Sequence, residues 1–106
     1  MVKDITPREL QARLGSSESP VVLDVREAWE REIASLPGTV HIPMSEVPAR
    51  LSELDPDRDL VVMCRSGGRS MQVAQFLDRQ GFRSVANLSG GILQWSDDID
   101  PSISKY

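Results

Sequence analysis

The sequence has few of the residues that hold very small proteins together covalently. Its 106 residues include one cysteine, Cys64, and one histidine, His41. A lone cysteine cannot close an internal disulfide, and these two side chains fall short of the three or four ligands of a structural zinc site. Hydrophobic residues make up 40% of the chain, which is enough for a core at this length. We therefore expect a single domain over residues 1–106, with no metal and no cofactor.

Long apolar runs are also missing. No segment approaches the ~20 apolar residues of a membrane span, and residues 1–10 carry charge from Lys3 onward without the apolar centre of an export signal. The net charge of −4 argues against binding to a phosphate backbone. We expect a cytoplasmic protein that binds neither membrane nor nucleic acid.

The charges are distributed unevenly along the chain. Residues 1–57 contain six basic and eleven acidic side chains, whereas residues 58–83 contain five basic and two acidic ones. The basic segment also contains Cys64, between Met63 and Arg65. This coincidence makes the surroundings of Cys64 the first candidate for a functional site.

Short apolar runs alternate with segments of helical periodicity. Strands are predicted near Ile5 and at residues 21–25, 39–42, 60–63 and 85–88. Helices are predicted at residues 7–14, 26–33, 45–54, 70–81 and 92–97, the first of them from the capping box of Thr6 and Glu9. Residues 98–106 are expected to form a loose C-terminal tail. The alternation predicts an α/β fold with a mainly parallel sheet, in which ligands bind at the carboxyl ends of the strands.

Cys64 ends one of these buried strands and begins a glycine-containing loop. The glycines at 67 and 68 allow successive backbone amides to converge on an anion, and the arginines at 65 and 69 add positive charge. Such surroundings favour the thiolate, which is the nucleophilic form. A lone cysteine is often merely a small core residue, but packing alone demands neither the glycines nor the arginines. We interpret residues 64–69 as a nucleophile loop.

Other polar residues have weaker claims to a functional role. Asp24 and Arg26 end a strand near the same edge of the sheet, and we expect them to form a buried pair that supports the loops. His41 is not assigned to catalysis. Trp29 and Trp95 are expected to anchor the core or its loops.

Four motifs in order give the chain a family resemblance. They are Asp24-Val25-Arg26-Glu27 with Trp29-Glu30, His41-Ile42-Pro43, Cys64-Arg65-Ser66-Gly67-Gly68-Arg69-Ser70, and Leu88-Ser89-Gly90-Gly91 with Trp95. Together they resemble the rhodanese-like, single-domain sulfurtransferases over residues 5 to about 96. The resemblance implies a rhodanese-like three-layer fold, with a mainly parallel five-stranded sheet flanked by helices on both faces.

The resemblance also implies a reaction and roles for the loop. Cys64 would take sulfane sulfur from a donor such as thiosulfate, hold it as a persulfide, and pass it to cyanide, a thiol or a protein acceptor. Cys64 is then the catalytic nucleophile. The residues that bind the substrate are Arg65, Ser66, Gly67, Gly68, Arg69 and Ser70, with the amides of 65–69 around the persulfide, the two arginines attracting the donor, and Ser70 capping the next helix.

Two alternatives remain open beside a thiosulfate sulfurtransferase. The chain could be a sulfur-relay module that serves a protein partner, with the acidic residues 1–57 as a docking face. Phosphatase or arsenate reductase chemistry is the other alternative. The resemblance disfavours it, because related phosphatases and arsenate reductases have a loop one residue longer than the six residues from Cys64 to Arg69.

Overall fold

The apolar runs form five parallel strands in one sheet. These strands are β1 (Lys3–Ile5), β2 (Val21–Asp24), β3 (Val40–His41), β4 (Asp59–Met63) and β5 (Ser84–Leu88). Their order is β1-β5-β4-β2-β3, and every neighbouring pair is parallel. The computed structural model, which describes residues 1–106, therefore confirms the predicted α/β fold and places β4 in the middle of the sheet.

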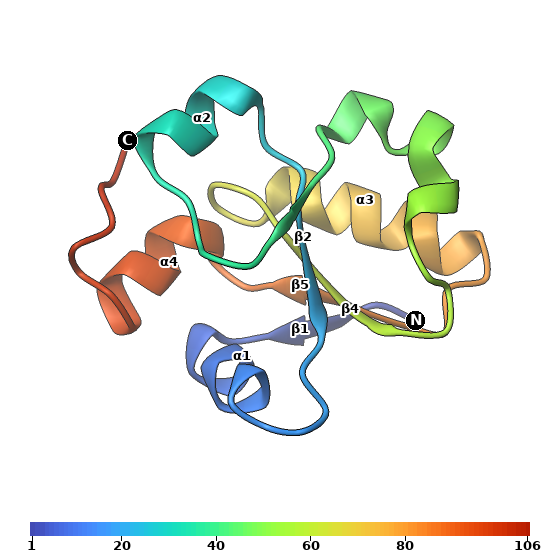
Figure 1. Ribbon diagram of the computed structural model, residues 1–106, viewed down its shortest axis with the longest axis horizontal. Helices are drawn as coiled ribbons and strands as arrows, with labels where there is room; N and C mark the ends of the chain where they lie inside the picture. Colours follow the sequence, from blue (N-terminus) through green and yellow to red (C-terminus); the bar gives the residue numbers. More distant parts are fainter.

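Helices cover both faces of the sheet (Figure 1). They are α1 (Pro7–Leu14), α2 (Ala28–Ile33), α3 (Gly68–Arg79) and α4 (Gly91–Asp98). Helix α3 lies on one face, α1 and α4 lie on the other, and α2 lies near the edge at which β2 ends. The predicted capping box begins α1, since Thr6 Oγ1 accepts from the Glu9 amide and Glu9 Oε1 accepts from the Thr6 amide. None of these helices has the length and hydropathy of a membrane span.

The prediction of an α-helix at residues 45–54 is wrong. The chain forms two short 3₁₀ helices there, η1 (Met44–Glu46) and η2 (Pro48–Glu53). Arg50 leaves the helical region with φ −116° and ψ 19°. A regular α-helix therefore does not continue through this segment.

The core alternates between the two faces of β4. Leu60 and Val62 belong to the cluster that α3 covers, and Val61 and Met63 belong to the cluster that α1 and α4 cover. Because side chains alternate along a strand, the residue after Met63 points toward α3. That residue is Cys64, which belongs to the first cluster.

Residues 99–106 are not loose, contrary to expectation. Ile99, Ile103 and Tyr106 pack against the cluster under α1 and α4. Ser96 in α4 donates a hydrogen bond from its Oγ to the carbonyl of Ile103 at 2.7 Å. The segment returns from α4 toward α2 (Figure 1). Its apolar side chains thus bring Tyr106 to the edge of the sheet at which the nucleophile loop begins.

Candidate active site

The nucleophile loop leaves the centre of the sheet and enters a helix almost at once. Cys64 follows β4 directly, and its side chain is 1% exposed. Gly67 then takes a φ of +109° and precedes the first residue of the twelve-residue helix α3. A side chain at 67 would be strained in this left-handed region. The turn at Gly67 therefore places Cys64 beneath the N-terminus of α3.

Several hydrogen-bond donors converge on the sulfur of Cys64. The Gly67 amide donates to Sγ at 3.1 Å, and Ser70 Oγ lies 3.2 Å from Sγ. Burial raises the pKa of the Cys64 thiol, but the Ser70 hydroxyl and the amides of Ser70, Gly67 and Ser66 lower it by more. The net pKa is below that of an ordinary cysteine, so the site favours the reactive thiolate.

Ser70 is not the helix cap that the sequence predicted. The capping position is Gly67, and Ser70 lies inside the first turn of α3. Its buried hydroxyl faces inward instead, with Cys64 Sγ on one side and Asn87 Oδ1 at 2.5 Å on the other. A hydroxyl has one proton, so Ser70 can donate to only one of these acceptors at a time.

Asn87 is a site residue that the sequence analysis missed. It is 4% exposed, and its Nδ2 donates to the carbonyl of Gly67 at 3.3 Å. Asn87 therefore orients both the turn at Gly67 and the hydroxyl of Ser70. A signal was present in the sequence, because Asn87 is the one polar residue among the apolar positions 85–88.

The N-terminus of α4 donates two hydrogen bonds to the backbone of the nucleophile loop. The amide of Ile92 donates to the carbonyl of Cys64 at 3.0 Å, and the amide of Leu93 donates to the carbonyl of Arg65 at 3.2 Å. These two carbonyls satisfy donors that a helix N-terminus otherwise leaves unpaired. Gly91 makes this approach possible, because a Cβ there would lie 2.4 Å from the Arg65 carbonyl oxygen.

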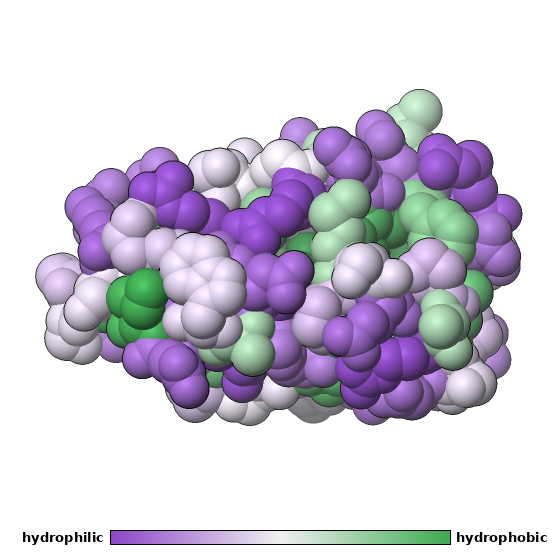
Figure 2. Space-filling model, turned by 90° about the horizontal axis from the view of Figure 1, so that it is seen from above, coloured by the Kyte–Doolittle hydropathy of each residue, from purple (hydrophilic) through white to green (hydrophobic).

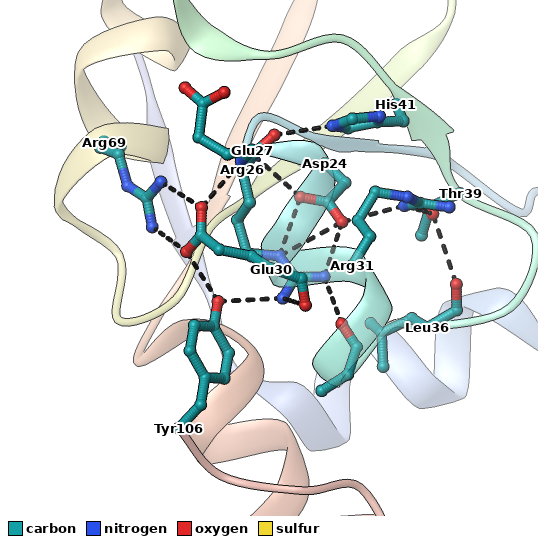
Figure 3. Close-up of polar contacts among 11 residues, drawn as sticks. Asp24, Arg26, Glu27, Glu30, Arg31, Leu36, Thr39, His41, Arg69 and Tyr106 are labelled. Carbon is teal, nitrogen blue, oxygen red and sulfur yellow. Dashed lines mark hydrogen bonds and ion pairs between the residues drawn. The ribbon is translucent and has the colours of Figure 1, made fainter.

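The Arg69 guanidinium is paired with a carboxylate from α2. Both of its terminal nitrogens donate to Glu30, each at 2.7 Å (Figure 3). The hydrogen bonds from Arg69 outweigh burial and lower the pKa of Glu30 to about 2. Glu30 occurs in one of the motifs, but the sequence alone assigned it no role. The pair ties the first turn of α3 to α2.

A buried network supports α2, as the sequence predicted for Asp24 and Arg26. Both side chains are fully buried, and Arg26 donates to Asp24 through Nε at 3.0 Å and through Nη2 at 2.8 Å. Arg26 also donates to the carbonyl of Ala34 at 2.8 Å, and Arg31 adds a contact to Asp24 at 3.0 Å. The network in Figure 3 joins β2, α2 and the segment after it.

His41 lies at the periphery of this network. Its Nε2 is 2.7 Å from the carbonyl oxygen of Arg26, and its side chain is half-buried. This contact joins the end of β3 to the segment before α2. The imidazole of His41 is therefore paired with a backbone carbonyl.

Arg65 is exposed but already has a partner. Its Nε donates to the main-chain oxygen of Tyr106 at 2.6 Å, and its guanidinium carbon lies 5.2 Å from the centre of the Tyr106 ring. The edge of Trp29 meets the same ring at a centroid distance of 6.2 Å. Trp95 is buried, as expected of a core residue, whereas Trp29 is 59% exposed and lies outside the core.

The face around the site is mostly hydrophilic. Figure 2 views it from above, and hydrophobic surface appears there as separate patches within a largely hydrophilic surface. One hollow of about 320 Å³ lies between η1 and α3, and its lining includes the apolar Met44, Val47, Val73 and Phe76 as well as the polar Gln72, Gln75 and Arg79. Cys64 does not line that hollow. The nucleophile loop is therefore the candidate site because of the chemistry of its residues, and not because it lines a large cavity.

Removing the Ser70 hydroxyl is expected to make Cys64 less reactive at neutral pH. Hydrogen bonds to charged groups contribute about 1.5 kcal/mol or more, so at pH values below the pKa of Cys64 the thiolate fraction of Ser70→Ala should fall by up to roughly tenfold. The pKa of Cys64 rises in this variant, because the hydrogen bond from Ser70 that lowers it is lost while burial still raises it. The rate of alkylation by iodoacetamide, measured against pH, should shift to higher pH. Ser84→Ala, at an exposed position on β5, is the control, and an unshifted profile for Ser70→Ala would contradict this role.

Fold and site together define an α/β protein with an activated cysteine at the carboxyl edge of a parallel sheet. The family model described as "Rhodanese-like domain" matches residues 6–98. A protein named "Sulfurtransferase" from Allochromatium vinosum is 40% identical over 96 residues, which cover 91% of this chain and 90% of that protein. The chain therefore belongs to the rhodanese-like domain family and to the sulfurtransferase class of enzymes.

Two further comparisons agree on the fold. The crystal structure of a rhodanese-like domain protein from Staphylococcus aureus has a TM-score of 0.85 and 28% identity, and 99% of each chain is covered. The chloroplastic rhodanese-like/PpiC domain-containing protein 12 of Arabidopsis thaliana is 45% identical over 99% of this chain. The chain spans 38% of that protein's length. The same domain thus occurs within a longer chain.

Proposed function

We propose that this protein moves sulfane sulfur from thiosulfate, or a similar anionic donor, to a thiophilic acceptor through a persulfide on Cys64. The observation that carries the proposal is the convergence of the Gly67 amide and the Ser70 hydroxyl on Sγ, at 3.1 and 3.2 Å. These donors stabilise a negative charge on sulfur, which is present in both the thiolate and the persulfide.

In the first half-reaction, the Cys64 thiolate attacks the outer sulfur of thiosulfate. A bond forms between Sγ and that sulfur, the S–S bond of thiosulfate breaks, and its electron pair leaves with sulfite. The amides of residues 65–69 and the Ser70 hydroxyl would surround the resulting persulfide anion. Arg65 and Arg69 would attract the donor's negative charge, with Ser66, Gly67 and Gly68 forming the wall of the anion site.

In the second half-reaction, an acceptor attacks the terminal sulfur of the persulfide. Cyanide gives thiocyanate and a thiol gives a new persulfide, and in both cases the S–S electron pair returns to Sγ as the thiolate. The cycle needs no external oxidant or reductant. Asp24 and Arg26 contribute by fixing α2, and through Glu30 they fix the position of Arg69.

Intact-mass measurement tests this mechanism directly. Reduced wild-type protein and Cys64→Ser are each incubated with thiosulfate, and cyanide is added afterwards. We expect the mass of one sulfur atom on the wild type alone, removed by cyanide with release of thiocyanate. Failure of the wild type to gain sulfur, or an equal gain on Cys64→Ser, would refute a Cys64 persulfide formed from thiosulfate.

The relay function is the second candidate, and the contacts of the two loop arginines favour it. Both guanidiniums are engaged by other parts of the chain, which weakens their attraction for a small anionic donor. A relay module would load sulfur in a single turnover but turn over slowly with thiosulfate and cyanide, since its acceptor is a protein. Steady-state turnover as fast as loading would exclude this candidate.

A further inference from the structure

The hydroxyl of Ser70 lies between two acceptors that compete for its one proton. Ser70 Oγ is 3.2 Å from Cys64 Sγ and 2.5 Å from Asn87 Oδ1. Ser70 is fully buried and Asn87 is 4% exposed, so neither acceptor is replaced by bulk water. A hydroxyl can donate only one hydrogen bond. The direction in which this proton points therefore affects the charge that Cys64 can carry.

The amide of Asn87 has only one orientation that satisfies its neighbours. Its Nδ2 lies 3.3 Å from the carbonyl oxygen of Gly67 and 3.5 Å from a carboxylate oxygen of Asp4 in β1. A carbonyl and a carboxylate only accept hydrogen bonds, so the donor end of the amide faces them and Oδ1 faces Ser70. Oδ1 has no proton of its own, so its short contact with Ser70 Oγ requires the hydroxyl proton. Ser70 thus donates to Asn87 in this arrangement.

Donation from Ser70 to Asn87 suits the thiol form of Cys64 better than the thiolate. While the proton points at Asn87, the lone pairs of Ser70 Oγ face Sγ and can accept from a thiol. A thiolate has no proton to donate, so Ser70 must turn its own proton toward Sγ and lose the hydrogen bond to Asn87. Two buried acceptors, Oγ and Oδ1, then face each other without a proton, which costs free energy. Asn87 therefore opposes the ionisation of Cys64 through Ser70.

The charged side chains around the nucleophile loop are not part of this competition. They are Arg65 in the loop, Arg69 in α3, Glu30 in α2, Asp4 in β1, and the pair of Asp24 and Arg26 at the carboxyl end of β2. The hydroxyl of Ser70 has hydrogen-bond contacts only with Cys64 and Asn87. Substitution of Asn87 leaves each of these charges in place.

We propose that Asn87 is a positioning residue that turns the Ser70 hydroxyl away from Cys64 and so holds part of the nucleophile in its unreactive thiol form. Its Oδ1 takes the proton of Ser70, while Gly67 and Asp4 hold its Nδ2. For sulfur transfer the proposal rests on the proposed function, in which the thiolate attacks the donor. The competition for the proton involves only Ser70, Asn87 and Cys64, so alkylation tests it without any sulfur transfer.

The test measures alkylation of Cys64 by iodoacetamide against pH in the wild type, Asn87→Leu, Ser70→Ala and the double variant. Leucine is close to asparagine in size but accepts no hydrogen bond, so Ser70 becomes free to donate to Sγ. Relative to its effect in the Ser70→Ala background, Asn87→Leu should lower the midpoint of the profile by about half a unit to one unit of pH when Ser70 is present. This shift corresponds to the loss of one hydrogen bond between uncharged groups.

The Ser70→Ala background separates the competition from a structural effect on the turn at Gly67, which loses a donor in Asn87→Leu. A looser turn alone would shift the midpoint equally in both backgrounds, and equal shifts would overturn the proposal. A difference of the opposite sign would overturn it too. If circular dichroism shows that Asn87→Leu does not fold, Asn87→Ala is measured in the same two backgrounds and should give a difference of the same sign. Failure of persulfide formation in the mass experiment would overturn the proposed function instead, and the alkylation profiles would still report the competition at Ser70.

Discussion

Replacement of Gly91 by alanine is expected to destabilise the protein by about 2–5 kcal/mol. A left-handed φ costs an L residue about 1–2 kcal/mol, and forcing extra atoms into a packed position adds about 1–3 kcal/mol. Gly91 has a φ of +61°, and a Cβ would lie 2.4 Å from the Arg65 carbonyl oxygen and 2.6 Å from that of Cys64. Both obstacles are backbone atoms of the nucleophile loop, which cannot rotate away. Urea denaturation would measure the loss.

Gly81 provides a matched control for Gly91→Ala. It also has a left-handed φ, of +90°, but nothing lies within 4 Å of its Cβ position. Gly81→Ala should therefore lose only the conformational part, about 1–2 kcal/mol. Equal losses at the two positions would contradict the steric argument. Equal losses would mean that α4 can move away from the loop at little cost in free energy.

Replacement of Arg26 by methionine is expected to destabilise the protein by a similar amount, about 3–5 kcal/mol. The substitution keeps an unbranched, apolar side chain but leaves the fully buried Asp24 without its main partner, and breaking a buried pair from one side costs this amount. The buried carbonyl of Ala34 also loses a donor. Hydrogen bonds from Arg26 hold the pKa of Asp24 below its ordinary value against burial. Without them burial raises that pKa, so the loss of stability should shrink as the pH falls and Asp24 is protonated.

A double-mutant cycle measures the coupling free energy between Asp24 and Arg26. Asp24→Asn combined with Arg26→Met should lose clearly less than the sum of the two single variants, because the second substitution removes the charge that the first leaves unpaired. Arg31→Met is the matched control. Its partly exposed side chain makes a peripheral contact to Asp24, so it should cost about 1 kcal/mol or less. Additive losses in the cycle would contradict a coupled buried pair.

The main outline of the fold could be predicted because it depends on local patterns. The apolar runs at 21–25 and 60–63 and the capping box at Thr6 correspond to observed elements nearly residue for residue. The segment 45–54 was predicted wrongly because Ser45 resembles a helix cap, whereas the backbone leaves the helical region at Arg50. Ser70 also resembles a cap, but Gly67 can turn the chain three residues earlier.

The partners of the loop side chains could not be predicted, because each comes from a distant part of the chain. Asn87 meets Ser70 across 17 positions, Glu30 meets Arg69 across 39, and Tyr106 lies 41 positions from Arg65. Local periodicity contains no information on such contacts. They depend on the order of the strands, which places β4 between β5 and β2.

By itself, the sequence determined the class of the fold, the position of Cys64 at the end of a buried strand, and the loop that follows it. These features depend on side-chain alternation, glycine freedom and helix capping, which act over a few residues. The tertiary structure decided what the two arginines bind and where the thiolate finds its hydrogen bonds. The physical reason is that charges and hydroxyls buried at one edge of a sheet must find partners there, and the strand order determines which residues those are.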